Sequence, residues 1–84
     1  MNVVEHLREW SASSGEWVEI CDLQRQFDPD DADRFAVGAR MADLLETLAD
    51  RMGRSGLVRA FASSTPESLR AEAAEYRAGR DPRA

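Results

Sequence analysis

The sequence predicts a mostly helical α+β domain with the element order α-β-α-α-β-α and a short two-stranded antiparallel sheet. Its 84 residues fit a single domain, which we place at residues 1–79, with residues 80–84 as a frayed basic tail. Apolar residues recur every three or four positions along most of the chain, as in amphipathic helices. Two short runs rich in β-branched and aromatic residues interrupt this pattern and predict the strands.

The N-terminal part predicts a helix, a turn, a strand and a short second helix. Asn2 is suited to cap a helix that ends near Trp10, and the "SASSG" run at residues 11–15 is typical of a turn. Glu16–Ile20 is the predicted strand. In the first helix, an apolar stripe is expected to face the core of the domain. It consists of Val3, Val4, Leu7 and Trp10.

The stretch "FDPDDADR" at residues 27–34 predicts the start of a long helix that ends near Met52, before Gly53. Asp28 is suited to the N-cap and Pro29 to the first helical position, with further aspartates in the first turn. The four aspartates either serve only to cap this helix or also act in binding. Both interpretations stay open at this point.

The C-terminal part predicts a second strand and a last helix. Leu57–Ala62 is the strand expected to pair antiparallel with Glu16–Ile20. Thr65 followed by Pro66 predicts a helix start, and Gly79 predicts the end of that helix near Ala78.

Composition argues against catalysis, cofactors and metal sites. Cys21 and His6 are each the only residue of their type, and no glycine-rich phosphate loop or serine nucleophile with a base is present. The aspartate block lacks the glycine turn and closing glutamate of a calcium loop. The N-terminus does not have the pattern of a signal peptide, and no apolar run approaches the ~18 residues that span a membrane. We therefore expect a soluble, cytoplasmic, non-enzymatic protein that binds no cofactor or metal.

Two segments resemble the winged helix-turn-helix superfamily. "EWVEICDLQRQF" is similar to the strand and second helix of such domains, and "ADLLETLADRMGRSGLVR" is similar to a reading helix that leads into the first wing strand. The chain continues after Ala62 directly into "SSTPES", so the wing is expected to be truncated to one strand. The resemblance implies a small DNA-binding protein associated with transcription.

Charge is distributed unevenly and supports two alternative functions. Residues 1–33 carry nine acidic side chains and two arginines, whereas residues 34–84 carry nine arginines and seven acidic side chains. Double-stranded DNA would be contacted through its phosphates by Arg40, Arg51, Arg54 and Arg59. In the alternative, an adaptor or inhibitor binds a basic protein partner through Glu16, Glu19, Asp22, Asp30, Asp31 and Asp33.

The segment "FAVGARMA" at residues 35–42 is apolar or small around nearly its whole circumference, which indicates burial on both sides. One interpretation is a homodimer interface. The other is packing against the last helix of the same chain. The residues assigned to the dimer interface are Phe35, Ala36, Gly38, Ala39, Ala42, Leu69 and Tyr76.

Overall fold

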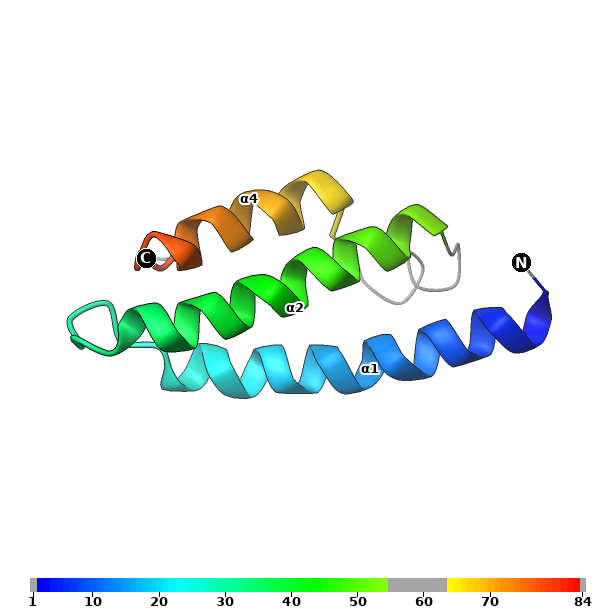
Figure 1. The fold of residues 1–84 in the computed structure, drawn as a ribbon, viewed down its shortest axis with the longest axis horizontal. Helices are drawn as coiled ribbons and strands as arrows, with labels where there is room; N and C mark the ends of the chain where they lie inside the picture. Colours follow the sequence, from blue (N-terminus) through cyan, green and yellow to red (C-terminus); the bar gives the residue numbers. More distant parts are fainter. Residues whose placement is uncertain (1, 55–63, 84) are drawn as a thin grey trace.

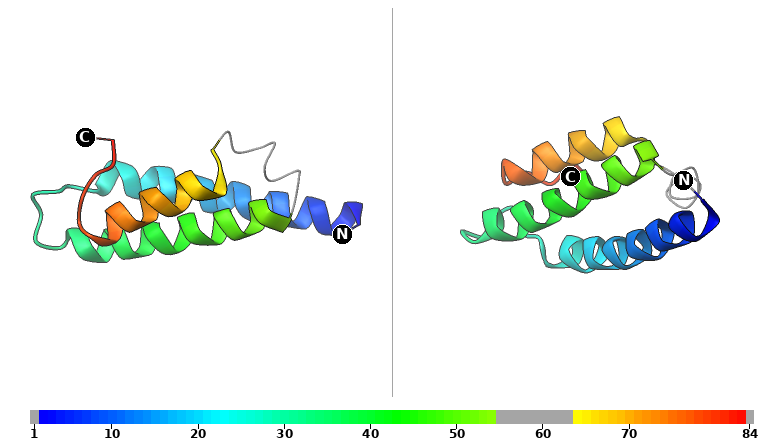
Figure 2. Two further views of the ribbon diagram at one scale, coloured as in Figure 1. Left: turned by 90° about the horizontal axis from the view of Figure 1, so that it is seen from above. Right: turned by 45° about the vertical axis from the view of Figure 1, so that its right-hand side comes forward.

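The computed structural model describes residues 2–54 and 64–83, and this part of the chain contains three helices. They are α1 (Val3–Gln26), α2 (Arg34–Arg54) and α4 (Pro66–Arg77). Figure 1 shows α2 lying between α1 and α4 and antiparallel to both. The molecule is elongated, with principal extents of 44 × 20 × 16 Å, because α1 continues past the end of α2 (Figures 1 and 2).

The predicted α+β class is wrong for the residues that the structure describes, since they contain helices and no strand. Glu16–Ile20 lies inside α1, and the "SASSG" run is helical too. The predicted partner strand, Leu57–Ala62, lies outside the described residues. Within α1, the hydroxyl of Ser14 donates a hydrogen bond to the carbonyl oxygen of Trp10 at 3.0 Å, so this serine does not compete with the helix.

Two of the predicted helix starts and one helix end are confirmed. Asn2 caps α1 in a capping box with Glu5, whose backbone N–H donates to the Asn2 side chain at 2.9 Å. Thr65 caps α4 in the same way with Ser68, and Pro66 is the first residue of that helix. Gly79 follows α4 with a φ of +76°, a left-handed conformation that favours glycine.

The predicted start of the long helix at Asp28 is wrong, because α2 begins six residues later, at Arg34. The side chain of Asp28 accepts a hydrogen bond from the N–H of Asp30, and Asp31 accepts one from the N–H of Asp33, both at 2.9 Å. Such bonds stabilise turns and compete with the helix. The aspartates therefore form the loop between α1 and α2 instead of capping α2.

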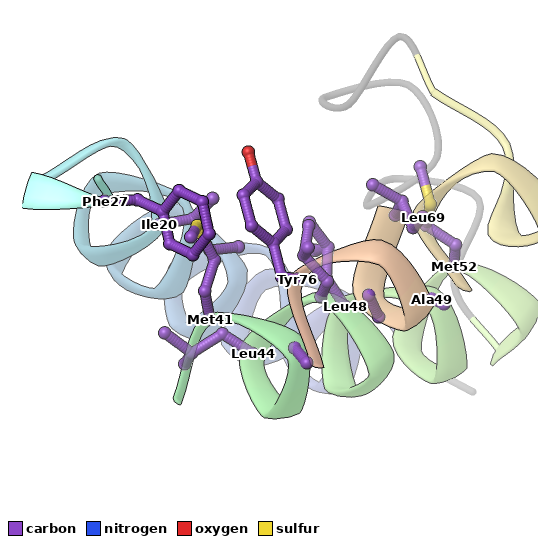
Figure 3. Close-up of a cluster of buried hydrophobic side chains, with 12 residues drawn as sticks. Ile20, Phe27, Met41, Leu44, Leu48, Ala49, Met52, Leu69 and Tyr76 are labelled. Carbon is purple, nitrogen blue, oxygen red and sulfur yellow. The ribbon is translucent and has the colours of Figure 1, made fainter. Parts of the chain in front are cut away.

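The core lies mainly between α2 and α4, and only the C-terminal half of α1 adds large apolar side chains to it. Within the buried cluster α1 contributes Ile20, while Phe27 follows directly after the helix. The ring of Phe27 packs edge-on against Tyr76 of α4, with centroids 5.1 Å apart (Figure 3). The remaining members of the cluster are Met41, Ala42, Leu44, Leu45, Leu48, Ala49, Met52, Leu69 and Ala73.

Helices α2 and α4 pack closely against each other at Gly38. A Cβ atom at this position would lie 2.2 Å from the carbonyl oxygen of Tyr76, so only glycine allows the two backbones to pack in this way. This contact requires glycine at position 38, and Met41 and Ala42 of the same segment are buried as well.

Candidate functional site

The most unusual surface of the molecule is an exposed apolar face on α1. The apolar stripe expected to face the core is instead exposed to solvent, which is a correction to the sequence interpretation. We call this surface the outer face of α1. It consists of Val3, Val4, Leu7, Trp10 and Val18, with exposed fractions of 72, 56, 56, 41 and 61%.

The face of α1 that packs on α2 is polar in its N-terminal half. Its residues recur at alternating spacings of four and three, as in a helix–helix seam. We call this the inner face of α1, and it consists of Glu9, Ser13, Glu16, Ile20, Leu23 and Phe27. Ser13 is completely buried, and its hydroxyl oxygen has no hydrogen-bond partner among the described residues.

Arg51 of α2 holds the polar half of the inner face in place. Its two terminal nitrogens donate to Glu9 at 2.7 Å and to Glu16 at 2.9 Å, two turns apart on α1. All three side chains are less than one quarter exposed. Burial lowers the pKa of Arg51, but the hydrogen bonds and charges of Glu9 and Glu16 outweigh it and raise the pKa above its usual value.

This cluster sets the rotation of α1 about its own axis. At 3.6 residues per turn, the inner and outer faces lie roughly 140° apart around the helix. Turning the outer face toward α2 would separate Arg51 from Glu9 and Glu16 and leave partly buried charges without partners, which is costly. The ion pairs therefore keep the apolar face directed outward.

Three of the four arginines predicted to bind DNA form ion pairs within the chain. Arg40 pairs with Glu19 at 2.8 Å, Arg51 is partly buried in the cluster just described, and Arg54 lies 3.7 Å from Glu9. Arg59 lies outside the described residues. Each of the three described arginines has a carboxylate beside it, which would repel a phosphate group.

The acidic residues predicted to bind a basic partner fall into two groups. Glu16, Glu19 and Asp22 pair with Arg51, Arg40 and Arg25. Asp30, Asp31 and Asp33 lie exposed together in the loop between α1 and α2. Of the six acidic residues predicted to bind a basic partner, only the three loop aspartates therefore lie together as an exposed acidic group.

The residues assigned to a dimer interface are mostly buried within one chain. Gly38, Ala42, Leu69 and Tyr76 lie in the contact between α2 and α4, so they are not accessible to a second copy in this fold. Phe35 and Ala36 are exposed and Ala39 is partly buried. Of the two interpretations of this segment, packing against the last helix of the same chain fits these positions.

The described residues offer little for small-molecule or metal chemistry. They enclose no pocket, and no three of their histidine, cysteine or acidic side chains are grouped to hold a metal ion. None of the helices in this part of the chain combines the length and apolar character needed to cross a membrane. Comparison with known proteins finds no matching protein-family model, curated protein or solved structure.

Sequence reasoning missed the inner face because half of its members are polar. A search for apolar periodicity selects Val3, Leu7 and Trp10 and passes over Glu9, Ser13 and Glu16. The signal that was present is the regular alternation of spacings from residue 9 to residue 27, combined with an arginine on α2 that can bridge two glutamates.

Proposed function

We propose that this protein is a non-enzymatic helical module that binds other proteins through the outer face of α1. One observation carries the proposal: in the N-terminal half of α1 the apolar face is exposed, while the polar face with Glu9 and Glu16 packs on α2. Contiguous exposed apolar patches on small proteins mark interaction sites. The helix-in-groove mode of recognition uses anchors at the spacing of Val3, Leu7 and Trp10.

The geometry favours this function over the two suggested by charge. The described arginines are engaged with carboxylates of the same chain, so phosphate binding would have to disrupt these pairs. Half of the proposed acidic surface is likewise engaged in ion pairs. Val3, Val4, Leu7 and Val18 are each more than half exposed in the folded chain, which favours binding through this face.

Site-specific photocrosslinking in cells tests the proposal. A photoreactive amino acid replaces Leu7 or Val18 in turn, and Thr47, an exposed polar residue of α2, is the matched control. We expect discrete crosslinked protein adducts from positions 7 and 18 and none from position 47. The absence of adducts from both positions on α1, with the protein folded and expressed, would contradict the proposal.

A mobility-shift assay on mixed duplex DNA tests the alternative. At low salt we expect no shift, because the carboxylates beside Arg40, Arg51 and Arg54 oppose phosphate contact. A shift that weakens steeply as salt is raised would instead indicate binding of phosphates by arginines.

A further inference from the structure

We infer that residues 80–83 form a strap that holds the C-terminal end of α1 to the α2–α4 pair, and that release of this strap frees that end of α1. Figure 2 shows this segment running from the end of α4 back toward the C-terminal end of α1. The inference goes beyond the proposed function, and its test needs no partner protein.

The strap begins at a turn that reverses the chain after α4. The N–H of Arg80 donates to the carbonyl oxygen of Glu75 at 2.9 Å, and the N–H of Gly79 donates to that of Tyr76 at 3.0 Å. Gly79 has a φ of +76°. These are the features of a Schellman motif, in which the backbone leaves the helix axis at a fixed angle. The direction of the strap is therefore set by the end of α4.

This turn packs against the start of α2. A Cβ atom at Gly79 would lie 2.8 Å from Nε of Arg34 and 2.8 Å from Cε1 of Phe35, so both side chains contact the glycine directly. Gly79 is buried by these contacts. The first part of the strap is therefore held against α2 as well as α4.

The other end of the strap contacts the last turn of α1. A terminal nitrogen of Arg83 donates to the carbonyl oxygen of Gln24 at 3.3 Å. Carbonyl groups in the last turn of a helix have no N–H partner within the helix, and a positive charge beside them is favourable. Arg83 therefore caps the C-terminal end of α1 from 59 residues further along the chain.

Asp81 fixes the conformation of Arg83. Its carboxylate accepts hydrogen bonds from the backbone N–H of Arg83 at 2.9 Å and from Nε of the same residue at 3.3 Å. The Asp81 side chain is only 17% exposed. Because Asp81 already holds the Arg83 side chain, less conformational entropy is lost when the guanidinium binds α1.

Arg83 also lies beside α4, next to the apolar contact between α4 and the end of α1. Burial raises the pKa of the Tyr76 hydroxyl, and the positive charge of Arg83 lowers it. The ring of Tyr76 packs on Phe27, the residue that directly follows α1. Release of Arg83 would therefore loosen α1 at the end that carries its apolar contacts.

Amide hydrogen exchange of the full chain, followed residue by residue by NMR, tests the strap. Arg83→Gln should speed exchange of the amides at residues 24–27 about three-fold, because the last turn of α1 loses its charged cap. The matched control is Arg80→Gln, because Arg80 pairs with Glu75 of α4, and the rates at residues 24–27 should then stay unchanged. Native rates at these residues in Arg83→Gln overturn the inference, as does an equal rise in Arg80→Gln.

A double variant tests whether Asp81 acts through Arg83. Asp81→Ala should speed exchange at residues 24–27 by less than Arg83→Gln, because the guanidinium keeps its charge but loses its support. The double variant should exchange no faster than Arg83→Gln alone. Rates that multiply in the double variant would show that Asp81 acts independently, and the connected strap would be wrong.

Gly79→Ala tests the start of the strap. Alanine is strained at this positive φ, and its methyl group would displace the side chains of Arg34 and Phe35, so the strap should shift and exchange at residues 24–27 should rise. Gly53→Ala is the matched control, because it adds the same methyl group to open space on α2 and should leave these rates unchanged. Native rates at residues 24–27 in Gly79→Ala would contradict a strap that is held at its start.

Discussion

Two glycines in helices have opposite roles, and the difference lies in what surrounds each Cα atom. Gly38 faces the backbone of Tyr76 at a distance that leaves no room for a methyl group, whereas Gly15 faces open space. Sequence alone placed Gly38 in the segment at residues 35–42 that was expected to be buried on both sides. It did not identify Gly15 as helical, because glycine after three small residues is more typical of a turn.

Replacing these glycines with alanine should therefore change stability in opposite directions. Gly38→Ala should lower the free energy of unfolding by about 1–3 kcal/mol, because α4 must move away from α2. Gly15→Ala should raise it by about 0.5–1 kcal/mol, since alanine is the better helix former. Urea denaturation in dilute solution measures both. An unchanged or higher stability of Gly38→Ala would contradict the close approach.

Tyr76 should make stability sensitive to alkaline pH. Burial raises the pKa of its hydroxyl, and the positive charge of Arg83 offsets this only in part. Above pH ~10 the unfolded chain loses this proton while the folded chain keeps it, so the free energy of unfolding falls as pH rises. Tyr76→Phe should remove this contribution to the fall in the free energy of unfolding at alkaline pH.

The chain contains one tyrosine, so its ionisation can be followed directly by ultraviolet absorbance. We expect tyrosinate to form at higher pH in the folded protein than in urea. Identical titration curves in the two conditions would show that the hydroxyl is not buried in solution.

At the scale of the helices, the sequence predicted caps well and the long N-terminal helix poorly. The starts at Asn2 and Thr65 could be predicted because Asn and Thr favour the N-cap and proline favours the first helical position after Thr65. The continuity of α1 could not be predicted, because it depends on contacts made after folding. These are the packing of Ile20 in the core and the ion pairs of Glu9 and Glu16 with Arg51 of α2. The start at Asp28 failed for a local reason: the aspartates bond to nearby backbone groups within the loop.

The position of α1 should depend on Arg51 much more than on other charges. Arg51→Met leaves Glu9 and Glu16 partly buried without their partner, and we expect a loss of about 2 kcal/mol in the free energy of unfolding. Arg40→Met is the matched control, because the Arg40–Glu19 pair is largely exposed and should contribute at most about 1 kcal/mol.

Amide hydrogen exchange locates the effect of Arg51→Met along the chain. Protection should fall in the N-terminal half of α1 and persist near Ile20 and in α2, where apolar contacts remain. Uniform loss of protection across all helices would show that the ion pairs stabilise the whole fold and do not specifically hold the N-terminal half of α1.

At the scale of the whole molecule, the helical class of most of the chain could be predicted, but the direction of the faces of α1 could not. Apolar periodicity indicates which residues share a face. It assumes that the more apolar face is the buried one. In the N-terminal half of α1 this assumption is wrong, because the hydrogen bonds of Arg51 to Glu9 and Glu16 hold the polar face against α2. The same reversal leaves the apolar side chains of this face exposed.

Hydroxyl-radical footprinting in dilute solution tests the outward direction of this face most directly. In dilute solution Leu7 and Val18 should be oxidised rapidly and Ile20 and Leu45 slowly, in line with their exposure. If Leu7 is protected as strongly as Ile20 in dilute solution, the outer face of α1 is buried within the monomer, and the proposed binding surface does not exist.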